Sequence, residues 1–325
     1  MAGKIALEEH FGATDPNIVE QSSEHFTAAA WPARRAMLLD IQDDRLRQMD
    51  ASGIELAVLS LLSPGIQALW RTEQAVDWAR RLNDHAAEQV ALRPDRFAAF
   101  AALPMQDPDE AVTELRRAVR DLGFVGAMIN GFSQIGAEDT AVYLDEERYR
   151  PFWAAVRQLD VPVYLHPRDG LPSRNQIYDG HPWLLGSAWG FSVETGTHAL
   201  RLMGSGLFDT YPGVQVILGH FGELLPFNIW RTDHRLAVAP RGIPAQRPLG
   251  DYLRNNFYLT ISGNYRTPAL LNTLLEVGAD RLLFATDYPF ETMIDASKWF
   301  DDVEINETDR AKISHLNARR LLKLR

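Results

Sequence analysis

The sequence predicts an α/β fold in which eight parallel strands and their connecting helices form one (β/α)8 TIM barrel. Short apolar runs of β-prone residues alternate with longer segments of helical period along the whole chain. Eight such runs are found, which is the number that closes a barrel. The first run ends in Glu-Glu-His, whereas a doubly wound sheet would carry a Gly-rich turn there. The chain has 325 residues, and its excess over the roughly 250 residues of a typical barrel fits a few long loops.

The expected strands are the short apolar runs, which are too brief for buried helices. In chain order they are residues 5–7, 56–61, 97–103, 124–129, 161–165, 214–218, 257–261 and 282–285. Most segments between them place apolar residues three and four positions apart, which is typical of helices. The expected helices are residues 72–92, 108–122, 149–159, 195–208, 268–277 and 308–324. Asp107-Pro108 is a start signal for the second of these helices, and Gly123 is its stop signal.

A single domain over residues 1–325 is expected, because no repeat, low-complexity tract or Pro/Ser-rich linker divides the sequence. Residues 11–35 show little periodicity. We expect them to form a long loop that follows the first strand and covers the mouth of the barrel.

Composition and charge restrict the function. The formal net charge is −10 and the basic residues form no dense run, so a nucleic-acid partner is not expected. The chain has no cysteine, which excludes disulfides, thiolate metal ligands and a cysteine nucleophile. It shows neither a signal peptide nor an apolar run of about 18 residues, so a cytoplasmic location without a membrane partner is expected. A small molecule is the expected partner.

Several expected strands end in residues capable of chemistry, and in a barrel the active site gathers at the C-terminal ends of the strands. These ends are Glu8-Glu9-His10, His166, His220 and Asp287, on the first, fifth, sixth and eighth strands. Side chains alternate along a strand. Glu8 and His10 are therefore expected to face the barrel interior, and Leu7 and Glu9 to face the helices.

Two imidazoles and two carboxylates that converge on one point form a cage for a divalent cation. The expected metal ligands are Glu8, His10, His166 and Asp287. Each of them alone has an ordinary alternative, since a single histidine is often a packed or surface residue and an aspartate often caps a helix. Their arrival from separate strand ends favours the metal site.

Other candidates are less specific. His220 need not touch the metal, and Glu223 is expected to orient its ring. Arg231 would pair either with a substrate carboxylate or with a neighbouring acid, and the sequence leaves both open. His25 and His181 are candidates to line a pocket, although exposure to solvent is expected for His25. The expected core or subunit-contact tryptophans are Trp183, Trp189 and Trp230.

Eight motifs in a fixed order resemble those of a known family. They are GKIALEEHF, DRFAAFAALPMQDP, GFVGAMINGFSQ, LDVPVYLHPR, YDGHPWLLG, VILGHFGE, ISGN and DRLLFATDYPFE. Together they are similar to the metal-dependent decarboxylases of the amidohydrolase superfamily, and most similar to the γ-resorcylate (2,6-dihydroxybenzoate) branch. The resemblance runs from about Gly3 to Leu324.

The resemblance implies roles for individual residues. Its metal ligands fall on the four residues already chosen from the strand ends. It further implies a catalytic role for His220 with Glu223, and substrate contacts for Arg231, Asn130 and Phe191. Hydrolytic members of the superfamily usually begin with His-x-His and often bridge two metals through a modified lysine. This chain has Glu8-x-His10 and a tyrosine in its fifth run, which implies a single divalent ion, with Mn²⁺ favoured and Zn²⁺ as the alternative.

The activity that the resemblance implies is the reversible, non-oxidative decarboxylation of 2,6-dihydroxybenzoate to resorcinol and CO₂. No signature of an organic electron-sink cofactor is found, so the ring itself must accept the electrons. Asp287 is the expected proton donor to the ring carbon, with His220 as the alternative. Other possibilities are decarboxylation of 2,3-dihydroxybenzoate, salicylate or a semialdehyde, hydrolysis of a lactone, ester or amide, and binding of aromatic acids without catalysis. A homotetramer is also implied by the resemblance.

Overall fold

The computed structural model describes residues 3–324, and its strands form one parallel sheet in the order β1 to β8. The strands are β1 (Lys4–Phe11), β2 (Ile54–Leu61), β3 (Phe97–Ala102), β4 (Gly126–Asn130), β5 (Val163–His166), β6 (Val216–Leu218), β7 (Phe257–Thr260) and β8 (Leu282–Leu283). Backbone hydrogen bonds from Leu7 to Phe284 (3.2 Å) and from His10 to Tyr288 (2.7 Å) join β1 to the segment around β8. The predicted (β/α)8 barrel and all eight predicted strands are thus confirmed.

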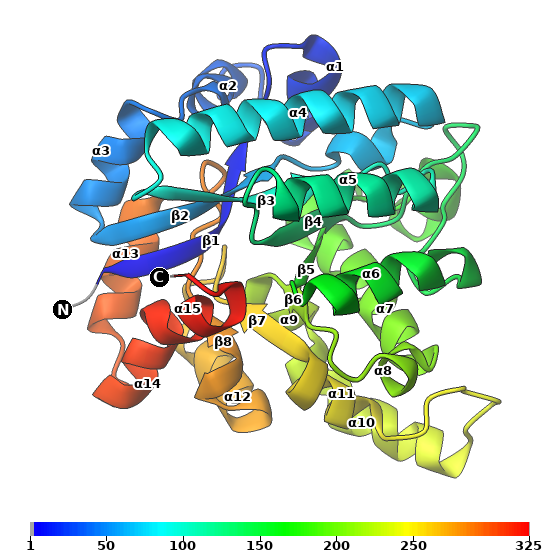
Figure 1. Cartoon of the computed structure of the whole chain (residues 1–325). Coiled ribbons are helices and arrows are strands. Elements are labelled where there is room, and N and C mark those ends of the chain that lie inside the picture. Colours follow the sequence, from blue (N-terminus) through cyan, green and yellow to red (C-terminus); the bar gives the residue numbers. More distant parts are fainter. Residues whose placement is uncertain (1–2, 325) are drawn as a thin grey trace.

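Helices surround the sheet (Figure 1). They are α1 (Pro16–Val19), α2 (Trp31–Leu39), α3 (Asp44–Ala51), α4 (Thr72–Leu92), α5 (Pro108–Arg120), α6 (Arg150–Leu159), α7 (Gly190–Gly204), α8 (Leu207–Thr210), α9 (His220–Glu223), α10 (Leu225–Val238), α11 (Leu249–Asn256), α12 (Thr267–Val277), α13 (Met293–Asp302), α14 (Glu307–Ala311) and α15 (Asn317–Leu322). Short helical turns are η1 (Glu20–His25), η2 (Gly65–Ala68), η3 (Glu147–Tyr149), η4 (Pro172–Arg174), η5 (Gln176–Tyr178), η6 (Pro182–Leu184), η7 (Gly186–Ala188), η8 (Ala279–Arg281) and η9 (Lys312–Leu316). The predicted start of α5 is confirmed, since the Asp107 side chain accepts hydrogen bonds from the N–H groups of Asp109 and Glu110.

The structure corrects three predicted segments. The helix predicted over residues 195–208 begins earlier and is interrupted, because Gly206 takes a left-handed φ of +75° between α7 and α8. The closing helix predicted over residues 308–324 is divided by the π-helical turn η9. Residues 11–35 are not one irregular loop, because α1, η1 and the first part of α2 lie within them.

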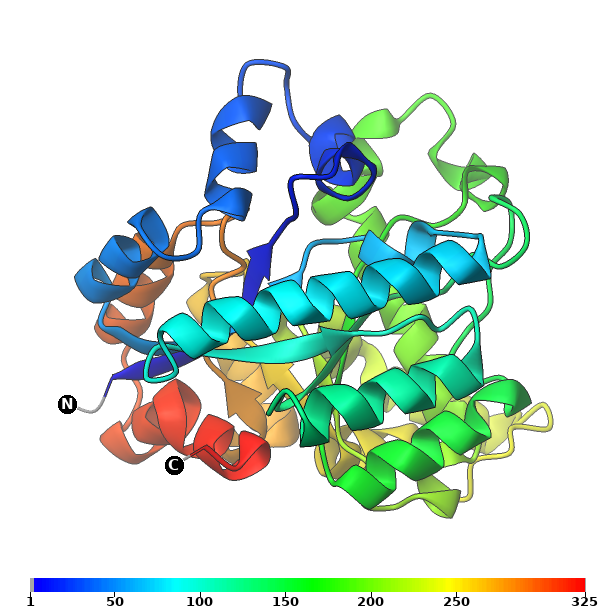
Figure 2. The same ribbon diagram turned by 45° about the horizontal axis from the view of Figure 1, so that its top comes forward.

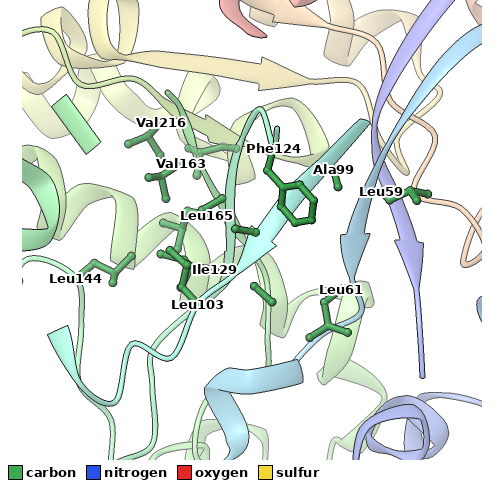
Figure 3. Packing of buried hydrophobic residues seen from close by; sticks show 14 of the residues in the cluster. Leu59, Leu61, Ala99, Leu103, Phe124, Ile129, Leu144, Val163, Leu165 and Val216 are labelled. Atoms are coloured by element: carbon green, nitrogen blue, oxygen red, sulfur yellow. The ribbon is translucent and has the colours of Figure 1, made fainter. Parts of the chain in front are cut away.

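Apolar side chains form two buried layers. The larger layer lies between the strands and the helices, and Figure 3 shows part of it, with Leu59, Ile129 and Val216 projecting from β2, β4 and β6. The smaller layer lies inside the barrel. Its buried members are Ile5, Leu7, Val58, Ala98, Phe100, Met128, Tyr164, Ile217, Tyr258, Leu283, Ala318 and Leu322. Burial of this apolar area is the main force that holds the strand ends in place.

The segment from α1 to α2 and the segment after β5 lie on the same side of the barrel, where β1 ends (Figure 2). The two marked chain ends lie together, away from these segments (Figures 1 and 2). Within the described part of the chain, no helix combines the length and apolarity that a membrane crossing requires.

Candidate metal centre and active site

Four side chains from distant parts of the sequence meet at the C-terminal ends of the strands. They are Glu8 and His10 on β1, His166 on β5 and Asp287 after β8, and one ligand atom from each lies within 4.8 Å of all the others. All four residues are buried. His10 Nε2 is 3.3 Å from Asp287 Oδ1, and His166 Nε2 is 3.3 Å from Glu8 Oε1. The structure therefore brings the predicted ligands together.

An irregularity in β1 explains how Glu8 reaches the interior. Ala6 pairs with Ala57 and Glu9 with Leu59, so β1 holds one more residue than β2 over this stretch. The prediction that Leu7 faces the helices is wrong, because Leu7 lies in the apolar layer inside the barrel. The extra residue allows Leu7 and Glu8 to point to the same side, which strict alternation forbids.

Glu8 is held by one of its two carboxylate oxygens. Oε2 accepts hydrogen bonds from the hydroxyls of Tyr164, Ser262 and Thr260. Oε1 is buried and has no hydrogen-bond partner among the described residues. Burial would raise the pKa of Glu8, but the imidazoles around it, first among them His220, hold that pKa well below its usual range. An ionised carboxylate with one saturated and one free oxygen is suited to bind a cation.

His10 presents a second free donor atom. Its Nδ1 lies 3.2 Å from Ser60 Oγ, while its Nε2 is buried and finds no hydrogen-bond partner in the described part of the chain. Burial lowers the pKa of His10, against the opposing effect of Asp287. A neutral imidazole is the form that binds metals. The two orphaned atoms, His10 Nε2 and Glu8 Oε1, thus fit a divalent ion held by nitrogen and oxygen.

Asp287 lies between two imidazoles. His10 approaches one carboxylate oxygen, and His220 Nε2 lies 3.6 Å from the other, Oδ2. Burial would raise the pKa of Asp287, but its interactions with His10 and His220 lower it, so the carboxyl group is ionised. The Asp287 backbone has a left-handed φ of +64°, which costs a non-glycine residue about 1–2 kcal/mol. Packing and hydrogen bonds around the site must offset this cost.

His220 lies beside the cage, and its ring contacts the Glu223 carboxylate. Its Nδ1 is 2.7 Å from Glu223 Oε1, and its Nε2 is 3.5 Å from Glu8 Oε1. Burial lowers the pKa of His220, but the carboxylates of Glu223 and Glu8 raise it well above its usual value. The backbone from His220 to Leu224 has positive φ at every residue, which turns the side chains of His220 and Glu223 toward each other.

A cavity of about 310 Å³ opens beside the cage. It is lined by Ser22, His25, Phe26, Ser63, His166, Ser187, Phe191, His220, Gly263, Asp287, Phe290 and Glu291. A second hollow of about 930 Å³ shares His25, Ser63, Ser187 and Phe191 with it. The larger hollow touches none of the four cage residues, so the smaller cavity is the candidate substrate site and the larger one its approach from the surface.

The remaining predicted residues differ in their position relative to the cavity. Phe191 lines the cavity. Asn130 is buried at the end of β4 and donates a hydrogen bond to the Leu62 carbonyl, but it is absent from the cavity wall. Arg231 is exposed on α10 and lines neither hollow. Trp183, Trp189 and Trp230 are all exposed, which excludes the core position that was one of their two predicted roles.

Sequence reasoning missed several residues of the cavity wall. Ser22 and Phe26 come from the segment that was expected to be an irregular loop. His25 is exposed, as expected, and it also lines the cavity, where its Nε2 lies 3.7 Å from Asp169 Oδ2. Phe290 and Glu291 lie three and four residues after Asp287, and their nearness to a predicted ligand is the one signal that could have identified them.

Comparison with known proteins agrees with this geometry. The chain is 55% identical to the γ-resorcylate decarboxylase of Rhizobium radiobacter, over 100% of this chain and 99% of the relative. A crystal structure of 2,6-dihydroxybenzoate decarboxylase complexed with 2,6-dihydroxybenzoate superposes with a TM-score of 0.97 and 55% identity, covering 100% of both chains. A dihydroxybenzoic acid decarboxylase from Polaromonas sp. JS666, with bound manganese and the inhibitor 2-nitroresorcinol, has a TM-score of 0.97 and 54% identity, and the match covers 100% of this chain and 98% of that one.

The family model described as "Amidohydrolase" matches residues 25–324. This match, together with the full-length similarity to the relatives above, shows that the chain belongs to the amidohydrolase family, in the group of its γ-resorcylate decarboxylases.

Proposed function

We propose that this chain catalyses the reversible, non-oxidative decarboxylation of 2,6-dihydroxybenzoate to resorcinol and CO₂. The observation that carries the proposal is the buried cage beside a cavity of about 310 Å³, with Glu8 Oε1 and His10 Nε2 left without hydrogen-bond partners among the described residues. The relatives named above supply the substrate class. Phe26, Phe191 and Phe290 give the cavity the apolar walls that an aromatic ring requires.

One divalent ion would be held by Glu8, His10, His166 and Asp287. When bound, it would act as a Lewis acid that favours ionised oxygen groups on the substrate. Mn²⁺ is the proposed ion and Zn²⁺ the alternative, because two carboxylates and two imidazoles suit either.

Asp287 is the proposed proton donor. It is ionised in the free site, so the substrate must supply the proton: the ortho hydroxyl passes it to Asp287 on binding. Asp287 then transfers that proton to the ring carbon that bears the carboxylate. The bond to the carboxylate breaks, its electron pair returns to the ring, and CO₂ leaves. A solvent proton finally converts the phenolate product to resorcinol, which balances the reaction.

His220 supports this transfer from the side of Asp287 Oδ2. Glu223 holds its ring and favours the protonated form. A protonated imidazole at this position stabilises negative charge that develops on the substrate. It is also the alternative proton donor.

We further propose that the chain forms a homo-oligomer, and the tetramer is the expected state. The exposed apolar side chains of α10 support this proposal. Phe227 is 86% exposed and Trp230 is 70% exposed. Arg231 is next to Trp230 on this helix and lines neither of the two hollows described above. Its proposed contact with the substrate carboxylate therefore requires that a second copy bring α10 over the cavity.

Metal analysis and a product assay test the function together. Purified protein should contain close to one Mn²⁺ or Zn²⁺ per chain and should release CO₂ from 2,6-dihydroxybenzoate. Chelation should abolish turnover, and Mn²⁺ should restore it. Full turnover without metal would contradict the proposal, as would hydrolysis of esters, lactones or amides in the absence of CO₂ release.

A further inference from the structure

Glu9 is a buried carboxylate that the proposed reaction does not use. It lies between two cage residues in the sequence, but it points away from them. Its Oε1 accepts a hydrogen bond of 2.9 Å from the Thr286 N–H, and its Oε2 accepts one of 2.6 Å from the Thr286 hydroxyl. Both carboxylate oxygens thus bind the residue that precedes Asp287.

This contact takes the place of a backbone hydrogen bond between β1 and the segment that follows β8. β8 ends at Leu283, and beyond it Phe284 and Tyr288 accept backbone hydrogen bonds from β1. Between these two carbonyls, the Thr286 N–H bonds to the Glu9 side chain instead of a strand carbonyl. On its other side, the Thr286 carbonyl accepts a hydrogen bond of 2.7 Å from the Tyr265 hydroxyl. The peptide groups of Thr286 are therefore held by side chains.

The residue held in this way leads directly into the left-handed backbone of Asp287. Such a conformation persists only where the surroundings determine it. We propose that Glu9 is a positioning residue: its carboxylate fixes Thr286, and through Thr286 it sets the Asp287 side chain at the cage. The inference rests on the proposed function, because it takes Asp287 as a metal ligand and proton donor.

Arg45 is buried beside the backbone of Glu9. It is fully buried and donates hydrogen bonds to the His10 and Asp40 carbonyls, and its guanidinium lies 4.7 Å from the centre of the Tyr288 ring. It also donates a hydrogen bond to the Glu9 backbone carbonyl. Removal of the Glu9 carboxyl group would leave the buried N–H and hydroxyl groups of Thr286 without this partner, so a loss of stability is expected in addition to any effect on the cage.

The test must separate positioning from stability. Glu9→Leu removes both acceptors, whereas Glu9→Gln keeps an acceptor for the Thr286 N–H and a polar partner for its hydroxyl. Thr286→Val removes one of the two hydrogen bonds and leaves the Glu9 side chain in place. Glu114→Leu is the matched control, because Glu114 is also a buried carboxylate, but it bonds to Asn83 and Arg117 between α4 and α5.

Mn²⁺ affinity of the folded protein is the main readout, measured by the loss of the free Mn²⁺ signal in electron paramagnetic resonance. Glu9→Leu should weaken binding by about 10- to 100-fold, as expected for a residue that orients a ligand. Thr286→Val should weaken it less, and Glu9→Gln and Glu114→Leu should leave it unchanged. If Glu9→Leu does not fold, Thr286→Val decides the question.

Several results would overturn the inference. Unchanged Mn²⁺ affinity in both Glu9→Leu and Thr286→Val would do so, and so would an equal loss in Glu114→Leu, since that would indicate general destabilisation. These results leave the proposed function intact. If the unsubstituted chain binds neither Mn²⁺ nor Zn²⁺, the proposed function itself fails, and the inference about Glu9 fails with it.

Discussion

The Nδ1 atom of His220 lies 2.7 Å from Oε1 of Glu223, and this pair sets the charge of the imidazole beside the cage. Glu223 is buried and three residues away on the same turn, where each residue has a left-handed backbone. Since the carboxylate favours the protonated ring, His220 stays cationic to a higher pH than a free histidine would.

Replacement of Glu223 should therefore shift the pH dependence of the reaction. Glu223→Gln removes the negative charge and lowers the His220 pKa, so the protonated ring is lost at a lower pH. The descending alkaline limb of kcat/KM should move to lower pH, and Glu223→Asp should partly restore its position. An unchanged profile in Glu223→Gln would exclude a role for the His220 charge.

Asp287→Asn should separate metal binding from proton transfer. The amide keeps one oxygen for the cage but cannot carry the proton, so part of the metal should remain while kcat falls by about 10²- to 10⁴-fold. Elemental analysis and a CO₂-release assay on the same preparation measure both quantities. Near-normal turnover in this variant would contradict Asp287 as the proton donor and would favour His220 instead.

His10→Ala should act on the metal instead. It removes the orphaned Nε2 atom, so the metal content of purified protein should fall well below that of the unsubstituted chain. Ser60→Ala is the matched control, because Ser60 touches only the opposite ring nitrogen. A fully loaded His10→Ala protein would contradict the ligand assignment.

The proposed role of Arg231 predicts complementation between two inactive proteins. Arg231→Ala should lower activity with the metal retained, since the residue is remote from the cavity of its own chain. When Arg231→Ala and Asp287→Asn chains are unfolded, mixed and refolded together, some sites receive an intact Arg231 from one chain and an intact Asp287 from the other. Activity should reappear in the mixture. Its absence, with mixed oligomers verified by native mass spectrometry, would place Arg231 outside the substrate site.

His198 should make the fold sensitive to acid. It is buried on α7, where its Nε2 accepts a hydrogen bond of 3.0 Å from the Leu144 N–H, and burial lowers its pKa to about 3. Above about pH 6.5 the ring is neutral in both the folded and unfolded states. As the pH falls below this value only the unfolded state binds the proton, so stability falls by about 1.4 kcal/mol per pH unit until the folded pKa is reached.

Urea unfolding between pH 7 and pH 4.5 measures this effect. His198→Phe should be less stable at pH 7 but should lose less free energy of unfolding as the pH falls. The exposed His181 supplies the control, and His181→Phe should keep the slope of the unsubstituted chain. Equal slopes for His198→Phe and the unsubstituted chain would show that His198 does not contribute.

The eight strands and the cage were predictable for one physical reason. Parallel strands of a barrel end at the same rim, so acids and imidazoles that follow apolar runs must meet there. Glu8, His10, His166 and Asp287 all follow this rule. The orientation of Leu7 was predicted wrongly. It depends on a one-residue irregularity in the pairing of β1 with β2, and the sequence pattern of a single strand does not reveal such an irregularity.

The walls of the cavity were harder to predict. Ser22 and Phe26 lie in a segment of short helices that are too brief for a periodic signal. His25 contacts Phe191, with ring centres 5.5 Å apart, across more than 160 residues of sequence, and such a contact depends on how two irregular segments fold against each other. The position of Arg231 was not predictable either, since nothing in its neighbourhood indicates which way α10 faces.

The cage is anchored on strand ends, whereas part of the cavity wall comes from residues 22–26, in and just after η1, and from residues 187–191, in η7 and the start of α7. Reaction chemistry and ring selectivity therefore reside in separate parts of the polypeptide. If these two surface segments were replaced by those of another aromatic-acid enzyme, the set of accepted ring substituents would change. The metal site would be preserved.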